Sequence, residues 1–265
     1  MWAKLFEPNE YVPSLIQLLT PLAIYLGWEY NWYWWALSIF FFSSYRIIGH
    51  SVGLHRYYCH SQFTTTRLGE LIIGWFSLMS CLGSPASYTI VHLIHHRYSD
   101  TDNDPHGPAR GLRSLFYAYW VPPDPKSLEK TPVFTRRLSQ ILPYYWIHQW
   151  YWPLILINAG LLYLISYKIF LFVWFIPVCL TLWEMAISTY LSHWTRHGYR
   201  PTNHSNLAGW LFPYHEYLHD THHKHPLLGN HATKPCEIDY TYWVSKLFAT
   251  SWRMETLNEK HLSAK

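Results

Sequence analysis

The sequence predicts an all-α membrane protein in which two helical hairpins, four spans in total, carry a helical cap on the cytoplasmic side. Three observations lead to this fold class. Charged residues make up only 14% of the 265 residues, aromatic residues make up 19%, and long uncharged stretches alternate with polar segments rich in histidine. A soluble domain has about 25% charged residues, and a spanning helix needs about 20 mostly apolar residues. We therefore expect one membrane domain over residues 1–265.

The two hairpins follow from the uncharged stretches. Residues 12–27 contain no charged residue, and Lys168 is the clear break between the last two apolar stretches. Two buried hairpins of a soluble protein would give a similar pattern, but four such stretches grouped as two pairs favour the membrane. The expected spans are residues 12–27, 32–50, 146–166 and 169–191, and the expected cap consists of residues 51–145 and 192–265.

The basic residues indicate the orientation. Of the 20 Lys and Arg residues, only Lys168 lies in a short turn between two spans. Because cytoplasmic loops carry an excess of Lys and Arg, we expect both termini and the cap in the cytoplasm. Residues 68–83 are apolar but short, and a fifth span there would break this asymmetry, so we expect a helix in or under the membrane surface. A bacterial inner membrane and the endoplasmic reticulum both fit this orientation.

The net charge also excludes one class of function. A net charge of +4 is too weak for a nucleic-acid surface.

Eight of the 18 histidines form three clusters with spacings that suit metal binding. Two clusters have the pattern H-x-x-H-H, in which positions i, i+3 and i+4 of a helix lie within a narrow arc and can face one point. The third has the pattern H-x-x-x-x-H, and a spacing of five requires two metals or a distorted helix end. The clustered histidines exceed one coordination sphere and predict a dinuclear site: His55, His60, His92, His95, His96, His219, His222 and His223.

The composition of the clusters narrows the chemistry. Imidazole suits zinc, copper, iron and nickel, so the ligand type alone does not select the metal. Unactivated C–H bonds of a lipid chain resist acid–base chemistry, and a redox metal with oxygen is the agent that such a site beside a membrane suits. A metal transporter is the alternative of a different class, but it would need more polar side chains within its spans than Glu184 and Asn158. The remaining histidines that we considered are expected to be ordinary surface or hydrogen-bonded residues: His148, His204, His231 and His261.

These clusters, in this order and topology, resemble the histidine boxes of the membrane fatty acyl desaturases, specifically the branch that contains the acyl-CoA desaturases. The resemblance extends beyond the boxes and covers about residues 30–250. The matching segments are 53–60 (the first box), 92–106 (the second box, with its Asp-Pro-His tail), 198–201, 216–223 and 239–243.

The resemblance implies two iron ions, held by nine histidines and a water-linked asparagine, with molecular oxygen as co-substrate. The ninth histidine is expected at His193, with His197 as the alternative. The family asparagine falls at Thr189, a departure that puts the water-mediated ligand in question. Glu184 is an intramembrane carboxylate, a type of residue that is usually functional, although it could equally pair with a polar neighbour. Other residues expected close to the ligands are Asp104 and Glu216.

The resemblance also implies an activity, the insertion of a double bond into an acyl chain, with electrons from a separate donor such as a ferredoxin or a small cytochrome. Hydroxylation, acetylenic bond formation or another lipid oxidation on the same scaffold is the alternative. The residues just before His92 carry no charge, although acyl-CoA desaturases have basic residues there. Coenzyme A, acyl carrier protein and a lipid therefore all stay open as the carrier. Candidate contacts for its head group are Arg113, Lys126, Lys130, Arg136 and Arg137.

Overall fold

The computed structural model describes residues 12–105, 107, 111, 114–117, 145–203 and 217–256, and this part of the chain is mostly helical, as predicted. Two short antiparallel pairs of strands accompany the helices. In chain order the elements are α1 (Val12–Leu18), α2 (Thr20–Gly27), α3 (Trp32–Ser44), the π-helix η2 (Tyr45–Cys59), β1 (Phe63–Thr65), α4 (Arg67–Met79), α5 (Pro85–Tyr98), α6 (Ser114–Tyr117), α9 (Tyr145–Gln149), α10 (Tyr151–Ile165), α11 (Tyr167–Ile169), the π-helix η5 (Phe170–Phe175), α12 (Ile176–His193), β2 (Trp194–Thr195), β3 (Gly198–Tyr199), α14 (His219–Lys224), α15 (Tyr240–Ser245) and β4 (Ala249–Trp252).

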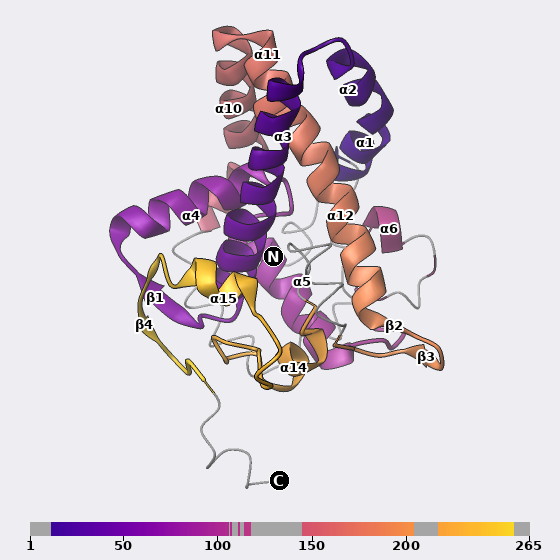
Figure 1. Cartoon of the computed structure of the whole chain (residues 1–265), viewed down its shortest axis with the longest axis vertical. Coiled ribbons are helices and arrows are strands. Elements are labelled where there is room, and N and C mark those ends of the chain that lie inside the picture. Colours follow the sequence, from indigo (N-terminus) through magenta and orange to yellow (C-terminus); the bar gives the residue numbers. More distant parts are fainter. Residues whose placement is uncertain are drawn as a thin grey trace, which may run out of the picture.

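The helices form an upright bundle with a smaller cap beneath it (Figure 1). Helices α3, α10 and α12 stand side by side in the upper part, and α5, α14 and α15 lie at the lower end. The strand pair β1–β4 joins Phe63 to Trp252 and so fastens the C-terminal part of the described chain beside the end of η2. The hairpin β2–β3 follows α12 directly. The cap therefore gathers segments that are far apart in the sequence.

One continuous helical run among the described residues is long and apolar enough to cross a membrane. It comprises α11, η5 and α12 and extends over 27 residues, Tyr167–His193. Helix α10 is also apolar but has only 15 residues. The first expected span is divided at Leu19 into α1 and α2, where Pro21 in the first turn of α2 removes one backbone donor. The four-span arrangement therefore stays a prediction.

The second expected span changes character after Ser44. Here α3 continues without a break into η2, a π-helix of 15 residues in which 12 are buried. Gly49 and Gly53 let this helix approach α4 closely, because a Cβ at Gly49 would lie 2.5 Å from the carbonyl oxygen of Phe76. The hydroxyl of Ser77 donates to the Gly49 carbonyl at 2.7 Å, which fixes the contact. The two glycines therefore set the position of η2 against α4.

Helix α4 lies across the bundle rather than along it (Figure 1). Thr66 caps its N-terminus by accepting a hydrogen bond from the backbone of Gly69 at 3.1 Å. Its outer face is apolar, because Leu68 and Leu71 are 67% and 57% exposed. A helix with one apolar face turned outward suits a membrane surface. The location of residues 68–83 in or under the membrane surface stays a prediction.

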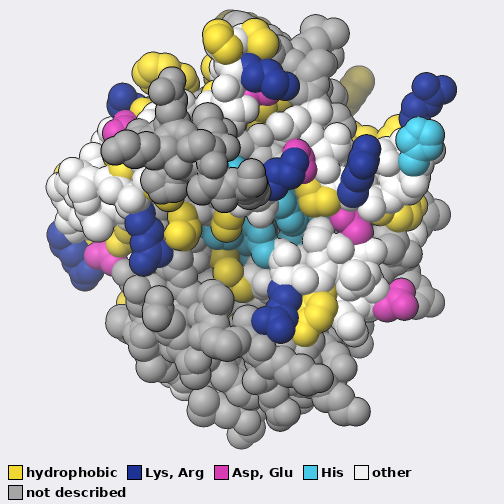
Figure 2. Space-filling model, turned by 90° about the horizontal axis from the view of Figure 1, so that it is seen from below, with side chains coloured by type: hydrophobic (Ala, Val, Ile, Leu, Met, Phe, Trp, Pro, Cys, Tyr) yellow, Lys and Arg dark blue, Asp and Glu magenta, His cyan; other side chains and the backbone are white. Residues whose placement is uncertain are grey.

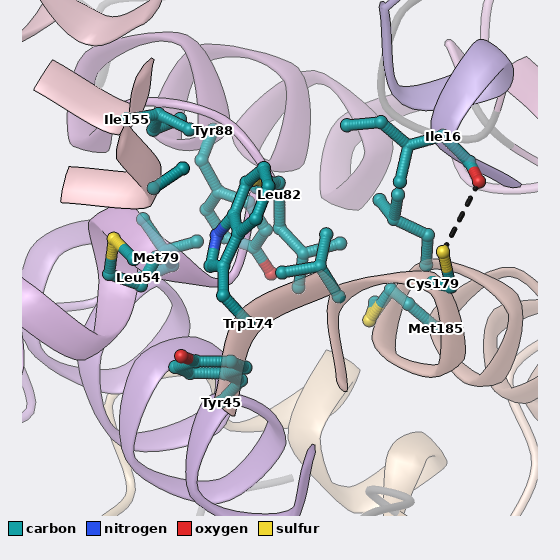
Figure 3. Packing of buried hydrophobic residues seen from close by; sticks show 14 of the residues in the cluster. Ile16, Tyr45, Leu54, Met79, Leu82, Tyr88, Ile155, Trp174, Cys179 and Met185 are labelled. Carbon is teal, nitrogen blue, oxygen red and sulfur yellow. Dashed lines mark hydrogen bonds between the residues drawn. The ribbon is translucent and has the colours of Figure 1, made fainter. Parts of the chain in front are cut away.

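The hydrophobic core lies between η2, α5 and α12. Figure 3 shows Tyr45 of η2, Tyr88 of α5 and Trp174 of η5, which leads directly into α12, packed together. The Sγ of Cys179 in α12 donates a hydrogen bond to the Ile16 carbonyl at 3.4 Å. Tyr88 is 2% exposed and lies one helical turn before His92 in α5. The core therefore continues directly into the histidine-rich part of the cap.

Candidate metal centre

Nine buried or half-buried histidines from four parts of the chain converge in the cap. Their imidazoles form two groups in which the potential ligand atoms all lie within 4.8 Å of one another. Figure 2, seen from below, shows histidine side chains in a central hollow of this face, with Lys and Arg side chains around it. We call the two sets the five-histidine group (His55, His60, His92, His96 and His222) and the four-histidine group (His95, His193, His219 and His223).

The five-histidine group is closed by short contacts between Nε2 atoms. Nε2 of His222 lies 2.9 Å from that of His55 and 2.8 Å from that of His96. Nε2 of His92 lies 3.0 Å from that of His96 and 3.1 Å from that of His60. Each of these rings thus directs its Nε2 towards the middle of the group. A single proton can be shared by only one pair of these Nε2 atoms at a time.

The π-helix explains the spacing of five in the first cluster. In η2 the backbone hydrogen bonds run from residue i to i+5, and the amide of His60 continues this pattern by donating to the His55 carbonyl at 3.0 Å. Residues five apart therefore stack above one another, and the rings of His55 and His60 lie 4.8 Å apart. A distorted helix was one of the two expected solutions, and the structure adopts it over the full length of η2.

The four-histidine group is oriented by two carboxylates. Nδ1 of His95 lies 2.9 Å from Oδ2 of Asp104, and Nδ1 of His193 lies 2.9 Å from Oδ2 of Asp100. Because the carboxylates accept the Nδ1 protons, Nε2 of both rings presents its lone pair to the group. Metal-binding histidines in proteins commonly have such carboxylate partners, which fix the tautomer and raise the basicity of the ligand.

The two groups lie side by side because neighbouring residues divide between them. His95 belongs to one group and His96 to the other, and the same holds for His223 and His222. The rings of His96 and His223 stack at 4.3 Å between centroids. The helices α5 and α14 thus each serve both groups. Each H-x-x-H-H triplet is therefore divided between two points and does not face one point, as its spacing had led us to expect.

Burial keeps these imidazoles neutral. It lowers the pKa of His55, His92 and His222 well below the usual 6.5, and the neighbouring histidines lower each pKa further. A neutral imidazole is the form that binds a metal. The absence of oxygen donors from both groups disfavours calcium and magnesium, whereas imidazole suits iron, zinc, copper and nickel. The residues present therefore fit two transition-metal ions, one per group.

The structure distinguishes between the two candidates for the ninth histidine. His193 is buried at the end of α12, and its Nε2 lies 2.8 Å from that of His219. His197 is exposed in the turn between β2 and β3 and belongs to neither group. The geometry thus brings His193 into the site, as the primary expectation had it.

The residues that we expected near the clustered histidines lie in different surroundings. Asp104 contacts His95, as described. Thr189 is buried, and its hydroxyl donates to the Met185 carbonyl at 2.9 Å. Glu184 forms an ion pair with the buried Arg46, which is the structural role we had left open for it. Glu216 and the head-group candidates Arg113, Lys126, Lys130, Arg136 and Arg137 lie outside the described residues.

Sequence reasoning missed the network that surrounds Arg56. The guanidinium of this residue donates to both carboxylate oxygens of Asp239 at 2.9 Å. It also lies 3.2 Å from Nδ1 of His231, whose ring is 5.0 Å from that of His222. His231 is thus hydrogen-bonded, as expected, but it lies against the site. The position of Arg56 directly after His55 was the available signal.

Three further residues beside the site had no clear signal in sequence. Asp100 contacts His193 across 93 residues of chain, and its backbone has a positive φ of 63°. His50 and Tyr88 form a hydrogen bond next to the five-histidine group.

Of the other histidines, His148 forms a hydrogen bond with Ser84 at 2.7 Å, while His204 and His261 lie outside the described residues.

The family model described as "Fatty acid desaturase" matches residues 30–237, which include all nine histidines. The chain belongs to the fatty acid desaturase family. The resemblance of the histidine boxes is therefore confirmed. Fatty acid desaturases are oxidoreductases of lipid metabolism, so the protein is an enzyme of that class. Family membership favours this enzyme over a metal transporter.

The chain is similar to two desaturases and an acetylenase that are named for three different acyl carriers. It is 27% identical to an sn-1 stearoyl-lipid 9-desaturase of Anabaena variabilis over 207 residues, which cover 76% of this chain and 75% of the relative. It is 25% identical to an acyl-CoA C20 Delta5-desaturase of Anemone leveillei, over 83% of this chain and 71% of the relative. A shorter segment of 74 residues is 42% identical to a hex-5-enoyl-[acyl-carrier protein] acetylenase of Moorena producens (strain JHB), and covers 28% of this chain and 21% of the relative.

Proposed function

We propose that the protein is an oxygen-dependent, non-haem di-iron desaturase that introduces a double bond into a fatty acyl chain. The observation that carries this proposal is the pair of all-imidazole groups, five and four histidines, that lie side by side in a member of the fatty acid desaturase family. A dinuclear site suits a reaction that removes two hydrogen atoms from neighbouring carbons.

The nine histidines would hold the iron, one ion in each group. Bound iron would supply the one-electron and oxygen chemistry that breaks unactivated C–H bonds. The protein's own part is to present the Nε2 lone pairs, through Asp100 and Asp104 in the four-histidine group. Burial also lowers the pKa of His55, His92 and His222, which keeps these three rings neutral. The packed apolar core that ends at Tyr88 keeps water from that side of the site.

The overall reaction needs a source of electrons. A –CH2–CH2– unit, one O2, two electrons and two protons give –CH=CH– and two molecules of water. These two electrons have to come from outside the site, because none of the nine histidines can supply them. We therefore propose a separate electron donor, such as a ferredoxin or a small cytochrome, that docks on the cap.

The membrane arrangement belongs to the same proposal. We propose four spans, both termini in the cytoplasm and the cap, residues 51–145 and 192–265, on the cytoplasmic side. The 27-residue run Tyr167–His193 supports it, and so do the apolar side chains that α10 exposes, such as Leu156 and Leu164, which are 65% and 80% exposed. Hydrocarbon around the bundle would cover these side chains. Bacterial inner membrane and endoplasmic reticulum both fit this arrangement.

The substrate is an acyl chain carried by a lipid, acyl carrier protein or coenzyme A, and the relatives are named for all three carriers. Residues Arg113, Lys126, Arg136 and Arg137 are our candidates for contacts with the head group. Acetylenic bond formation is the second candidate reaction. The 42% identity with an acetylenase segment favours it, and so does Thr189 at the position where the wider family has asparagine.

The test is mass spectrometry of the acyl chains in cells that express the wild type, His222→Ala or His197→Ala. His197 is the matched control because it is an exposed histidine outside both groups. We expect a new double bond with the wild type and with His197→Ala, and none with His222→Ala. A triple bond or a hydroxyl group would identify the sibling reaction instead. If His222→Ala gave the full product, His222 would not be a ligand.

A further inference from the structure

A hydrogen-bonded pair of buried polar side chains lies beside the five-histidine group without belonging to it. Nε2 of His50, in η2, lies 2.8 Å from the hydroxyl oxygen of Tyr88, in α5. The two residues are 4% and 2% exposed. The pair therefore joins, by side chains, the two helices that supply four of the five histidines of this group.

Each member of the pair stacks on one histidine of the group. The ring of His50 is parallel to that of His55, with 14° between the planes and 6.0 Å between centroids. The ring of Tyr88 is parallel to that of His92, at 17° and 5.3 Å. The rings of His55 and His92 in turn meet edge to face at 4.7 Å. The four rings thus form a closed set, which the hydrogen bond completes.

The local helix types produce this register. His50 precedes His55 by five residues, the separation of hydrogen-bonded residues in a π-helix, and Tyr88 precedes His92 by four residues, about one turn of an α-helix. In each helix the outer residue therefore lies directly over the inner one. An ordinary α-helix at η2 would rotate His50 away from His55 and break the stack.

The free-energy cost of burying two polar side chains favours a specific role for the pair. A buried polar group costs free energy unless it is hydrogen-bonded, and apolar side chains would fill this part of the core without that cost. The hydrogen bond between His50 and Tyr88, however, restricts the rotation of the two rings on which they stack, those of His55 and His92. Restricted rings keep Nε2 of His55 and His92 pointed into the group when no metal holds them.

We propose that His50 and Tyr88 are positioning residues that orient the imidazoles of His55 and His92 for metal binding at the five-histidine group. The proposal rests on the proposed function only in requiring that this group binds iron. It predicts that the hydrogen bond between the two side chains, and not merely their bulk, contributes to metal retention. Changes around a metal's ligands typically lower metal affinity about 10- to 100-fold.

The test is the release of iron from the purified full-length protein to a ferrous chelator, followed as absorbance over time. With one iron per group we expect two kinetic phases. Tyr88→Phe keeps the stacked ring and removes the hydroxyl, and we expect one phase to accelerate about 10-fold while the other is unchanged. Tyr45→Phe is the matched control, because the Tyr45 hydroxyl is also buried and donates to the Val173 carbonyl at 2.8 Å.

A double-variant cycle tests the hydrogen bond itself. If His50 and Tyr88 act through that bond, His50→Phe combined with Tyr88→Phe should release iron no faster than either single variant. Additive effects would overturn the proposal, as would a Tyr88→Phe protein with wild-type release or with both phases accelerated equally. A wild type that retains iron but forms no double bond would contradict the proposed function alone. A wild type that binds no iron in the five-histidine group would contradict both.

Discussion

The carboxylate of Asp104 accepts a hydrogen bond from Nδ1 of His95 at 2.9 Å, and both side chains are only 1% exposed. Asp104 also accepts from the backbone amide of Asp100 at 2.9 Å, and Asp100 in turn contacts His193. One short segment after α5 therefore orients two rings of the four-histidine group. The site depends on this segment as much as on the helices that carry the ligands.

Removing the charge of Asp104 should weaken the four-histidine group selectively. Asp104→Asn keeps the shape but no longer favours the tautomer of His95 that leaves Nε2 without a proton. We expect iron affinity at one of two sites to fall about 10- to 100-fold, measured by titration of the metal-free protein with ferrous iron. Asp220→Asn is the control, because Asp220 pairs with the exposed Lys224 at 2.6 Å. Equal affinities in both variants would show that Asp104 has no part in the site.

The buried pair Arg56–Asp239 should stabilise the assembly of the five-histidine group. It connects η2, next to His55, with the segment that precedes α15. Arg56→Met leaves the carboxylate of Asp239 buried without its cation, so we expect a loss of about 3–5 kcal/mol in the free energy of unfolding. Denaturant unfolding in detergent, followed by tryptophan fluorescence, measures it.

A second substitution tests the cause of that loss. In Arg56→Met combined with Asp239→Leu neither charge remains, so the double variant should regain part of the lost stability. If adding Asp239→Leu to Arg56→Met cost as much stability as Asp239→Leu costs in the wild type, the two residues would contribute independently. Arg67→Met breaks the exposed pair with Glu70 and should cost less than about 1 kcal/mol.

The metal-free protein should lose stability as the pH falls below about 6.5. In the folded chain burial holds the pKa of His55, His92 and His222 below 6.5, whereas in the unfolded chain each titrates near that value. Between these pKa values the unfolded chain binds protons that the folded chain does not, so stability falls with falling pH. The slope is at most about 1.4 kcal/mol per pH unit for each histidine. Melting temperatures between pH 7.5 and 5 check this, and a flat profile would contradict it.

The sequence predicted which histidines cluster better than it predicted their surroundings. The two H-x-x-H-H clusters were readable because α-helical periodicity alone directs three rings to one side, and His193 followed from the family resemblance. The spacing of five between His55 and His60 was ambiguous, since nothing in the amino-acid sequence of this segment distinguishes a π-helix from an α-helix. Asp100 was missed because it reaches His193 through a loop with a left-handed residue, which no periodicity describes.

The same limit applies to the pairs that hold the site together. His50 had no visible partner, since Tyr88 lies 38 residues away and comes beside it only when η2 packs on α5. Arg56 and Asp239 are separated by 183 residues. The apolar stretches were recognised, but helix breaks and the transition into η2 depend on packing, and so span lengths did not follow from composition.

Gly53 offers a test of how closely η2 must approach α4. A Cβ at this position would lie 2.9 Å from Cγ2 of Ile73 and closer still to the Ser77 hydroxyl, so Gly53→Ala forces the helices apart two residues before His55. We expect a loss of about 1–3 kcal/mol in stability together with faster release of iron from the five-histidine group. Gly160→Ala is the matched control, because nothing lies within 4 Å of its Cβ position in α10. Since alanine favours a helix by up to about 1 kcal/mol over glycine, Gly160→Ala should be neutral or stabilising. If Gly53→Ala retained both wild-type stability and wild-type iron release, the close approach of η2 to α4 would not be what positions His55.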